Sequence, residues 1–118
     1  MALLKNRTQE KTLLTDLHIA DRMWSRMKGL LGTSQLGPEQ GLWIHRCNSI
    51  HTFFMSYAID CVFVDDQMKV KALVKDVRPG RLVLPIWGAK SVIEVQSGWI
   101  EQKMISVGDT LDVGTAST

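Results

Sequence analysis

The stretch SIHTFFMSYAIDCVFVDD, residues 49–66, places the polar side chains of His51, Thr52 and Asp60 in a strongly apolar run. Side chains alternate along a strand, so Asp60 shares a face with Val62 and Val64. A buried carboxylate is costly unless it is paired. Its candidate partners are backbone N–H groups of a nearby loop, His51, Thr52 and Arg26. Asp60 is therefore expected either to pin the loop before it by accepting backbone hydrogen bonds, or to tune a neighbouring histidine or bind a ligand.

Cys47 and His51 have the residue types of a thiol nucleophile and its base, with Asp60 to orient the imidazole. The spacing Cys-x-x-x-His is not a specific signature of catalysis. We therefore keep an enzyme as the alternative interpretation and favour a protein that is not an enzyme. Four possible metal ligands lie within 17 residues: His45, Cys47, His51 and Cys61. No C-x-x-C or H-E-x-x-H spacing accompanies them, and we predict no metal and no cofactor.

The elements that must position these residues are mostly short strands. Alternating or apolar runs predict them at residues 2–6, 12–19, 42–47, 51–55, 59–65, 69–77, 82–87, 91–95 and 110–113. The segment from Asp21 to Leu31 has one apolar stripe and predicts the main helix. A short second helix is predicted from Gly98 to Lys103, capped by Ser97. We expect the four tryptophans, Trp24, Trp43, Trp87 and Trp99, to share one core.

These elements predict an α+β fold, mostly β, with an antiparallel or mixed sheet that curls into a small, partly closed barrel. The 118 residues suit a single domain, with a core at about residues 3–113 and a frayed tail at 114–118. Charged residues make up 22% of the chain and the formal charge is +2, without a basic block. We therefore expect no nucleic-acid partner. No apolar run is long enough for a signal or a membrane span, which predicts a cytoplasmic protein without membrane insertion.

Five ordered motifs carry a resemblance: RMKGLLG (26–32), NSIHTFFM (48–55), IDCVFVD (59–65), VIEVQSG (92–98) and VGD (107–109). Together they resemble the prokaryotic domain-of-unknown-function family 192, also called uncharacterised protein family 0127. The resemblance implies a compact β-rich domain with a helix after the first strands, and no established reaction. Its recurrent polar positions fall on Arg26, His51, Thr52, Asp60, Glu94 and Asp109, with glycines at 29, 98 and 108. Members often have proline where this chain has Ala58, and many members are exported.

Glu94 repeats the pattern of Asp60, as an acid between Ile93 and Val95. Arg26 is a cation that we expect to reach one of the two acids and hold the helix to the sheet. The sequence thus predicts a binding or accessory domain for a small molecule or a protein, either a monomer or a weak homo-oligomer. The predicted binding residues are His51, Thr52, Asp60, Cys47, Arg26 and Glu94. The alternatives are an enzyme that uses Cys47, His51 and Asp60, and a structural module for assembly.

Overall fold

A computed structural model describes residues 2–20, 35–53 and 55–115. Seven strands form one mixed sheet in the order β6-β5-β8-β3-β2-β1-β9, and β4 pairs with β7 in a separate two-stranded sheet. The strands are β1 (Ala2–Asn6), β2 (Lys11–Ala20), β3 (Gln40–His45), β4 (Ile50–His51), β5 (Ile59–Val64), β6 (Val70–Val77), β7 (Leu82–Val83), β8 (Ser91–Gln96) and β9 (Leu111–Thr115). Among the strand pairs of the described residues, β2 and β3 run parallel and the others are antiparallel.

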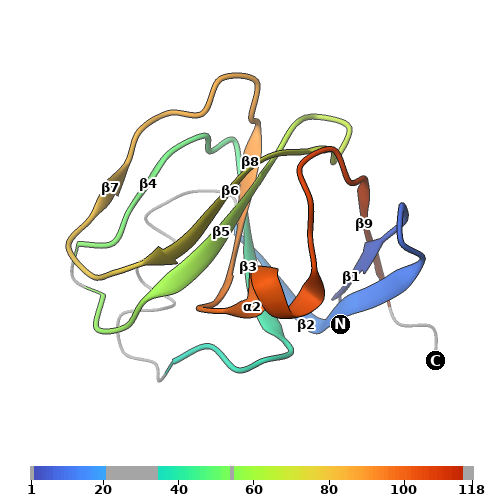
Figure 1. The fold of residues 1–118 in the computed structure, drawn as a ribbon, viewed down its shortest axis with the longest axis horizontal. Coiled ribbons are helices and arrows are strands. Elements are labelled where there is room, and N and C mark those ends of the chain that lie inside the picture. Colours follow the sequence, from blue (N-terminus) through green and yellow to red (C-terminus); the bar gives the residue numbers. More distant parts are fainter. Residues whose placement is uncertain (1, 21–34, 54, 116–118) are drawn as a thin grey trace.

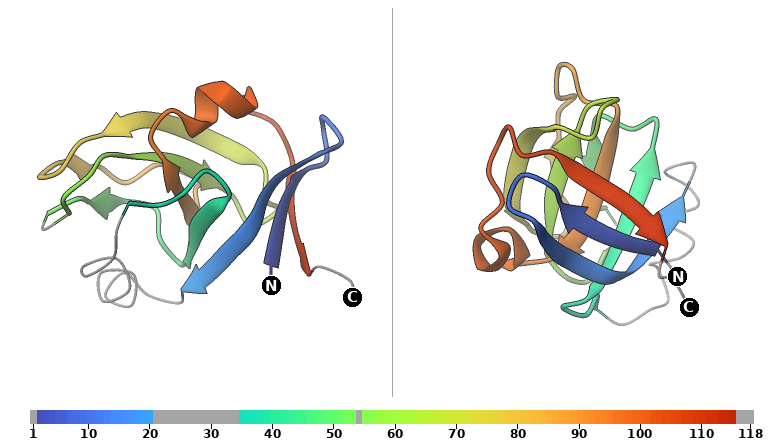
Figure 2. Two further views of the ribbon diagram at one scale, coloured as in Figure 1. Left: turned by 90° about the horizontal axis from the view of Figure 1, so that it is seen from below. Right: turned by 90° about the vertical axis from the view of Figure 1, so that its right-hand side faces the viewer.

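The large sheet curls into a half-barrel, which the two side views show clearly (Figure 1, Figure 2). At one end its edge strands meet: Lys69 bridges Thr110, and the Val70 N–H donates to Asp109 O at 2.8 Å. The mostly β, curled architecture is therefore as predicted. The predicted main helix, from Asp21 to Leu31, lies outside the described residues, and so does Arg26.

Two apolar cores lie on the two faces of this sheet. Val62 and Val64 of β5 face the first core, with Leu4, Leu13 and Trp99. Ile59, Cys61 and Phe63 face the second core, which β4 and β7 cover through Ile50 and Val83. Strand β5 is consequently buried along its whole length. Its alternation of faces was predicted correctly from the sequence.

The short helix α2 (Trp99–Lys103) follows β8 and packs its Trp99 and Ile100 into the first core. This confirms the predicted second helix. The predicted cap is wrong, because the Ser97 hydroxyl donates to Asp76 Oδ1 at 2.9 Å instead of capping α2. The N-cap residue is Gly98, whose φ of 93° lies in the left-handed region that favours glycine.

The turn between β5 and β6 is organised by Asp65. Its Oδ1 accepts the N–H groups of Gln67 and Lys69, both at 2.9 Å, in an Asx-type turn. Burial raises the pKa of Asp65, but these two hydrogen bonds and the Lys71 charge outweigh it and leave the pKa below its usual value. The turn therefore holds the register of the hairpin on which Asp60 lies.

Three details differ from the predicted elements. Strands β4 and β7 have two residues each, where longer strands were expected at 51–55 and 82–87. Strand β9 continues to Thr115, two residues into the expected tail. Trp43 and Trp99 belong to the first core, but Trp87 is 96% exposed, so the tryptophans do not share one core. Trp24 lies outside the described residues.

Candidate functional site

Asp60 is completely buried, and both of its carboxylate oxygens accept backbone N–H groups. Oδ1 accepts from Asp76 at 2.8 Å, and Oδ2 accepts from Gly98 at 3.1 Å and Ile100 at 3.0 Å. The Gly98 and Ile100 groups stand at the start of α2, where helical N–H groups have no partner within the helix. Asp60 thus caps α2 from a neighbouring strand, and its negative charge suits the positive end of the helix dipole.

The Asp76 N–H reaches Asp60 because β6 is irregular at this point. The register between β5 and β6 shifts between the Ile59–Val77 and Cys61–Val74 pairs, and Asp76 has a φ of 52°. Such a bulge turns one N–H out of the ladder. Here the Asp76 N–H turns to Asp60, so one carboxylate holds together β5, β6 and the start of α2. Acceptance of backbone hydrogen bonds was one of the two roles expected for Asp60, but the expected donors lay in the loop before it, whereas the donors in the structure come from β6 and the start of α2.

Glu94 lies on the opposite face of the sheet from Asp60. It pairs in register with Cys61, whereas Asp60 pairs with Val95. Paired residues of neighbouring strands point to the same face, so Glu94 faces the second core with Cys61, and Asp60 faces the first. Glu94 is fully buried. The two acids that looked equivalent in the sequence therefore lie in two different environments.

Cys47, His51 and Thr52 lie together in a feature we call the arm, which consists of residues 46–53 and 78–90. The two segments run antiparallel and include β4 and β7. The Cys47 N–H donates to Lys90 O at 3.0 Å, the Ile86 N–H to Asn48 O at 2.8 Å, and the Thr52 N–H to Arg81 O at 2.9 Å. In Figure 1 the arm lies to the left of β5 and β6, and its Ile50 and Val83 pack with residues of β5 in the second core.

Thr52 joins the two segments of the arm at its far end. Its buried hydroxyl donates to Arg78 O at 2.5 Å and accepts the Arg81 N–H at 2.9 Å. Its carbonyl accepts the Gly80 N–H at 2.9 Å. Thr52 therefore holds the loop from Arg78 to Arg81 in place, and it uses both the donor and the acceptor capacity of its hydroxyl to do so.

The two faces of the arm are both apolar. Ile50 and Val83 are partners and point to the second core. His51 and Leu82 are the next pair, so they point outward, together with Phe53 and Leu84 by alternation. The His51 and Phe53 rings stack with centroids 5.1 Å apart. Leu82 is 60% exposed and Leu84 69%.

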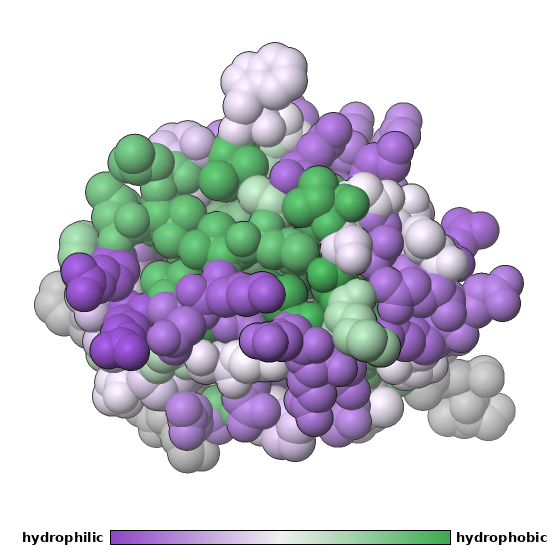
Figure 3. Space-filling view, in the orientation of Figure 1, coloured by the Kyte–Doolittle hydropathy of each residue, from purple (hydrophilic) through white to green (hydrophobic). Residues whose placement is uncertain are grey.

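Trp87 extends from the end of the arm opposite Thr52, where the arm joins β3 and β8. The Ala89 N–H donates to Ile86 O at 3.2 Å, which closes a tight turn with Trp87 and Gly88 at its centre. Gly88 has a φ of 84°, which a third turn residue of type II requires. Figure 3 shows apolar residues in a broad band over this side of the molecule, with hydrophilic side chains along its lower border. Sequence reasoning missed this surface, although the alternation of Leu82 and Leu84 around Val83 was a signal for it.

The predicted polar cluster is thus divided. His51, Thr52 and Cys47 belong to the arm. Asp60 lies beside α2 on the face of the sheet that carries the first core, and Glu94 lies on the face that carries the second core. Cys47 is buried, and its thiol donates to Ser49 O. Asp60 directs its carboxylate to backbone donors, not to an imidazole. Among the described residues, no three His, Cys, Asp or Glu side chains are close enough to hold a metal ion.

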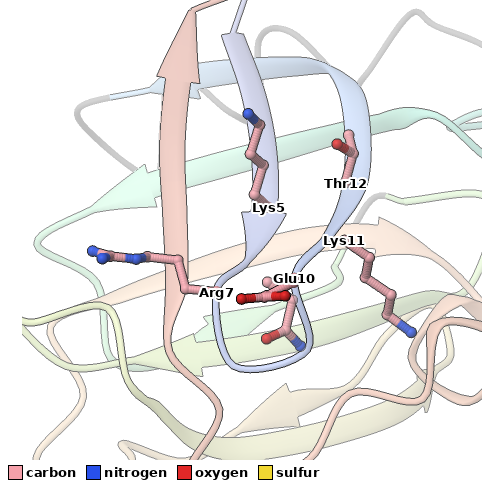
Figure 4. A pocket seen from close by; sticks show the side chains of 6 residues that line it. Lys5, Arg7, Glu10, Lys11 and Thr12 are labelled. Atoms are coloured by element: carbon pink, nitrogen blue, oxygen red, sulfur yellow. The ribbon is translucent and has the colours of Figure 1, made fainter.

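A separate shallow cavity of about 390 Å³ lies at the β1–β2 hairpin, lined by Lys5, Asn6, Arg7, Glu10, Lys11 and Thr12. Its Lys5, Arg7 and Lys11 side chains point in different directions (Figure 4). Lys11 Nζ donates to Lys103 O at 2.6 Å, and Asn6 Nδ2 donates to Asp109 Oδ2 at 2.9 Å. These polar groups already serve the fold and do not converge on a common point.

Solved structures define the class of fold. The chain superposes with a TM-score of 0.77 on a crystal structure titled a putative transcription regulator from Sinorhizobium meliloti, at 19% identity over 95% of this chain and 91% of that one. It matches a protein of unknown function from Novosphingobium aromaticivorans with a TM-score of 0.79, at 17% identity over 94% of this chain and 82% of the other. At these identities the likeness is one of fold alone.

Residues 4–113 match the model of the DUF192 family, described as "Uncharacterized ACR". A UPF0127 protein of Thermococcus sibiricus is 35% identical over 93% of this chain and 73% of its own length. A UPF0127 protein of Pyrococcus furiosus is 31% identical over 91% of this chain and 94% of its own. The chain belongs to the DUF192 (UPF0127) family, whose function is uncharacterised, and these two relatives are archaeal. Among the described residues there is no helix long and apolar enough to cross a membrane.

Proposed function

We propose that this protein is a binding domain that docks a partner protein on the outward face of the arm. The observation that carries the proposal is that both faces of the β4–β7 ribbon are apolar. An antiparallel ribbon with one face in water normally carries polar residues on that face. This ribbon instead presents Phe53, Leu82 and Leu84, and Trp87 is exposed in the turn at the end of the arm that joins β3 and β8.

The arm also has the rigidity of a preformed binding surface. Thr52 and the cross-segment hydrogen bonds hold its backbone, and the turn at Gly88 holds Trp87. A surface ordered before binding loses less conformational freedom when the partner arrives. Large exposed aromatic side chains supply much of the binding energy at protein interfaces. His51 and Thr52, two of the predicted binding residues, have distinct parts in this proposal: His51 is in the contact face and Thr52 supports it.

The polar residues away from the arm support the fold in this proposal. Asp60 fixes α2 and the β6 bulge, and Glu94 lies beneath the second core, on which the arm rests. They position the binding face and do not contact the partner. The arrangement favours binding over catalysis by Cys47, His51 and Asp60, because both carboxylate oxygens of Asp60 already accept hydrogen bonds from three backbone N–H groups.

Site-specific photo-crosslinking tests the proposal. A photo-reactive phenylalanine analogue at position 87, introduced in cells of the source organism, should yield a reproducible crosslinked protein. The same analogue at Asp112, an exposed residue of β9, is the matched control. Adding Leu84→Ser should reduce the crosslink from position 87 at least about tenfold, since a buried apolar anchor contributes more than 1.4 kcal/mol. Equal crosslinking from both positions, or no effect of Leu84→Ser, would overturn the proposal.

A further inference from the structure

We infer that the partner segment bound by the arm is acidic as well as apolar. This inference rests on the proposed function and adds the chemistry of the partner. The two segments of the arm, 46–53 and 78–90, contain four basic residues and no acidic residue. Their formal charge is +4, while the whole chain carries +2, so the rest of the chain carries −2. The charge of the molecule is thus divided between the arm and the remainder.

The four cations stand near the two ends of the arm. Arg46 and Lys90 are adjacent at one end, because the Cys47 N–H bonds to Lys90 O. Arg78 and Arg81 flank the other end, where Thr52 holds their backbone. All four residues are exposed. Arg78 is partly neutralised by the exposed Asp76, with Nε and Oδ2 3.4 Å apart. Within the described part of the chain, Arg46, Arg81 and Lys90 have no such ion pair and can meet a partner.

This pattern fits a chain segment with large apolar side chains at its centre and carboxylates towards its ends. Opposite charges at the border of an apolar contact speed association and exclude like-charged competitors. An anionic membrane would also attract cations next to apolar side chains. Basic clusters that hold proteins on anionic lipid typically contain about four to eight Lys or Arg residues together. The cations of the arm are fewer in each place, since they are divided between its two ends, and this favours a protein segment over a membrane surface.

The test begins with a random dodecapeptide display library panned against the intact protein at low ionic strength. We expect the selected peptides to combine aromatic or aliphatic residues with Asp or Glu. Binding of the synthesised peptides, measured by fluorescence anisotropy, should weaken at least tenfold in the Arg81→Glu/Lys90→Glu variant. It should also weaken at least tenfold between 50 and 500 mM salt. The control variant Lys5→Glu/Arg7→Glu makes the same charge change at the hairpin cavity and should bind as the wild type does.

Trp87→Ser separates this inference from the proposed function. Selected peptides that are apolar without acids, and that fail to bind Trp87→Ser, would overturn the inference and leave the arm as the binding face. Acidic peptides that bind Trp87→Ser normally, or a library that enriches nothing over this variant, would overturn both. Tighter binding to vesicles of phosphatidylglycerol than to any selected peptide, with the same loss in Arg81→Glu/Lys90→Glu, would replace the protein partner with a membrane surface. Unchanged circular dichroism spectra establish that the variants are folded.

Discussion

The Asp60 carboxylate accepts N–H groups from residues 16, 38 and 40 positions further along the chain. Hydrogen bonds to a charged acceptor are stronger than neutral ones, and a buried donor left without its partner is costly. The acid is therefore tolerated in a sheet interior because its charge is fully used by backbone donors. The sequence indicated that such donors must exist, and a nearby loop was one of the sources we expected. It could not indicate that most of them come from the start of α2, since that depends on where β8 ends.

Replacing this acid with its amide tests the role at the residue scale. In Asp60→Asn one oxygen becomes an N–H₂ group that faces backbone donors and can accept nothing. We expect the free energy of unfolding to fall by about 2–4 kcal/mol, measured by urea denaturation. Asp112→Asn, which alters an exposed carboxylate of β9, should change it by less than about 0.5 kcal/mol. A loss in Asp60→Asn no larger than that of the control would contradict the assigned role.

At the scale of elements, the arm is the part of the fold that sequence patterns predicted least well. Apolar runs at 51–55 and 82–87 predicted ordinary strands, but the ladder is two residues long on each side. The ladder stops at one end because the Thr52 carbonyl already accepts the Gly80 and Met55 N–H groups, and at the other end because Pro85 has no N–H to donate. The long strands β2, β5, β6 and β8 were predicted well, because β2 and β6 are long runs with partial alternation and β5 and β8 are continuous, mostly apolar runs that are buried on both faces. The exposed position of Trp87 was not predicted, since bulk and hydrophobicity alone favour burial.

The support that Thr52 provides can be removed while its shape is kept. Thr52→Val loses the hydroxyl bonds to Arg78 O and the Arg81 N–H. We expect amide hydrogen exchange across residues 78–90 to become about tenfold faster, which corresponds to roughly 1.4 kcal/mol of local stability.

Thr12→Val is the matched control for this substitution, because Thr12 is exposed in β2. It should leave exchange in the arm unchanged. If exchange in the arm is as slow in Thr52→Val as in the wild type, other contacts hold the loop and Thr52 is dispensable.

Closure of the half-barrel depends on Asp109 at the scale of the whole molecule. Its Oδ2 accepts Asn6 Nδ2 at 2.9 Å, Gln9 Nε2 at 3.0 Å and the Ser106 N–H at 3.1 Å. Its own carbonyl accepts the Val70 N–H at 2.8 Å. One residue thus links the β1–β2 hairpin, the segment after α2 and the first residue of β6. The family resemblance marked this position as a recurrent acid, but the sequence did not indicate what it joins.

Removing this carboxylate should weaken the whole sheet. In Asp109→Ala the buried Asn6 amide loses its acceptor, and we expect the free energy of unfolding to fall by about 2–3 kcal/mol. Differential scanning calorimetry should show a single transition at a lower Tm, because the contact belongs to the common core. A wild-type Tm, or a separate early transition confined to the hairpin, would show that closure does not depend on Asp109.

The remote cap of α2 has a consequence for the order in which the chain folds. A five-residue helix cannot persist alone, and its N-cap residue, Gly98, has no side chain that could cap it. Its first N–H groups find their acceptor only when β5 is already beside β8. We therefore expect α2 to form late, after the folding transition state, and to cover the first core once the strands have assembled.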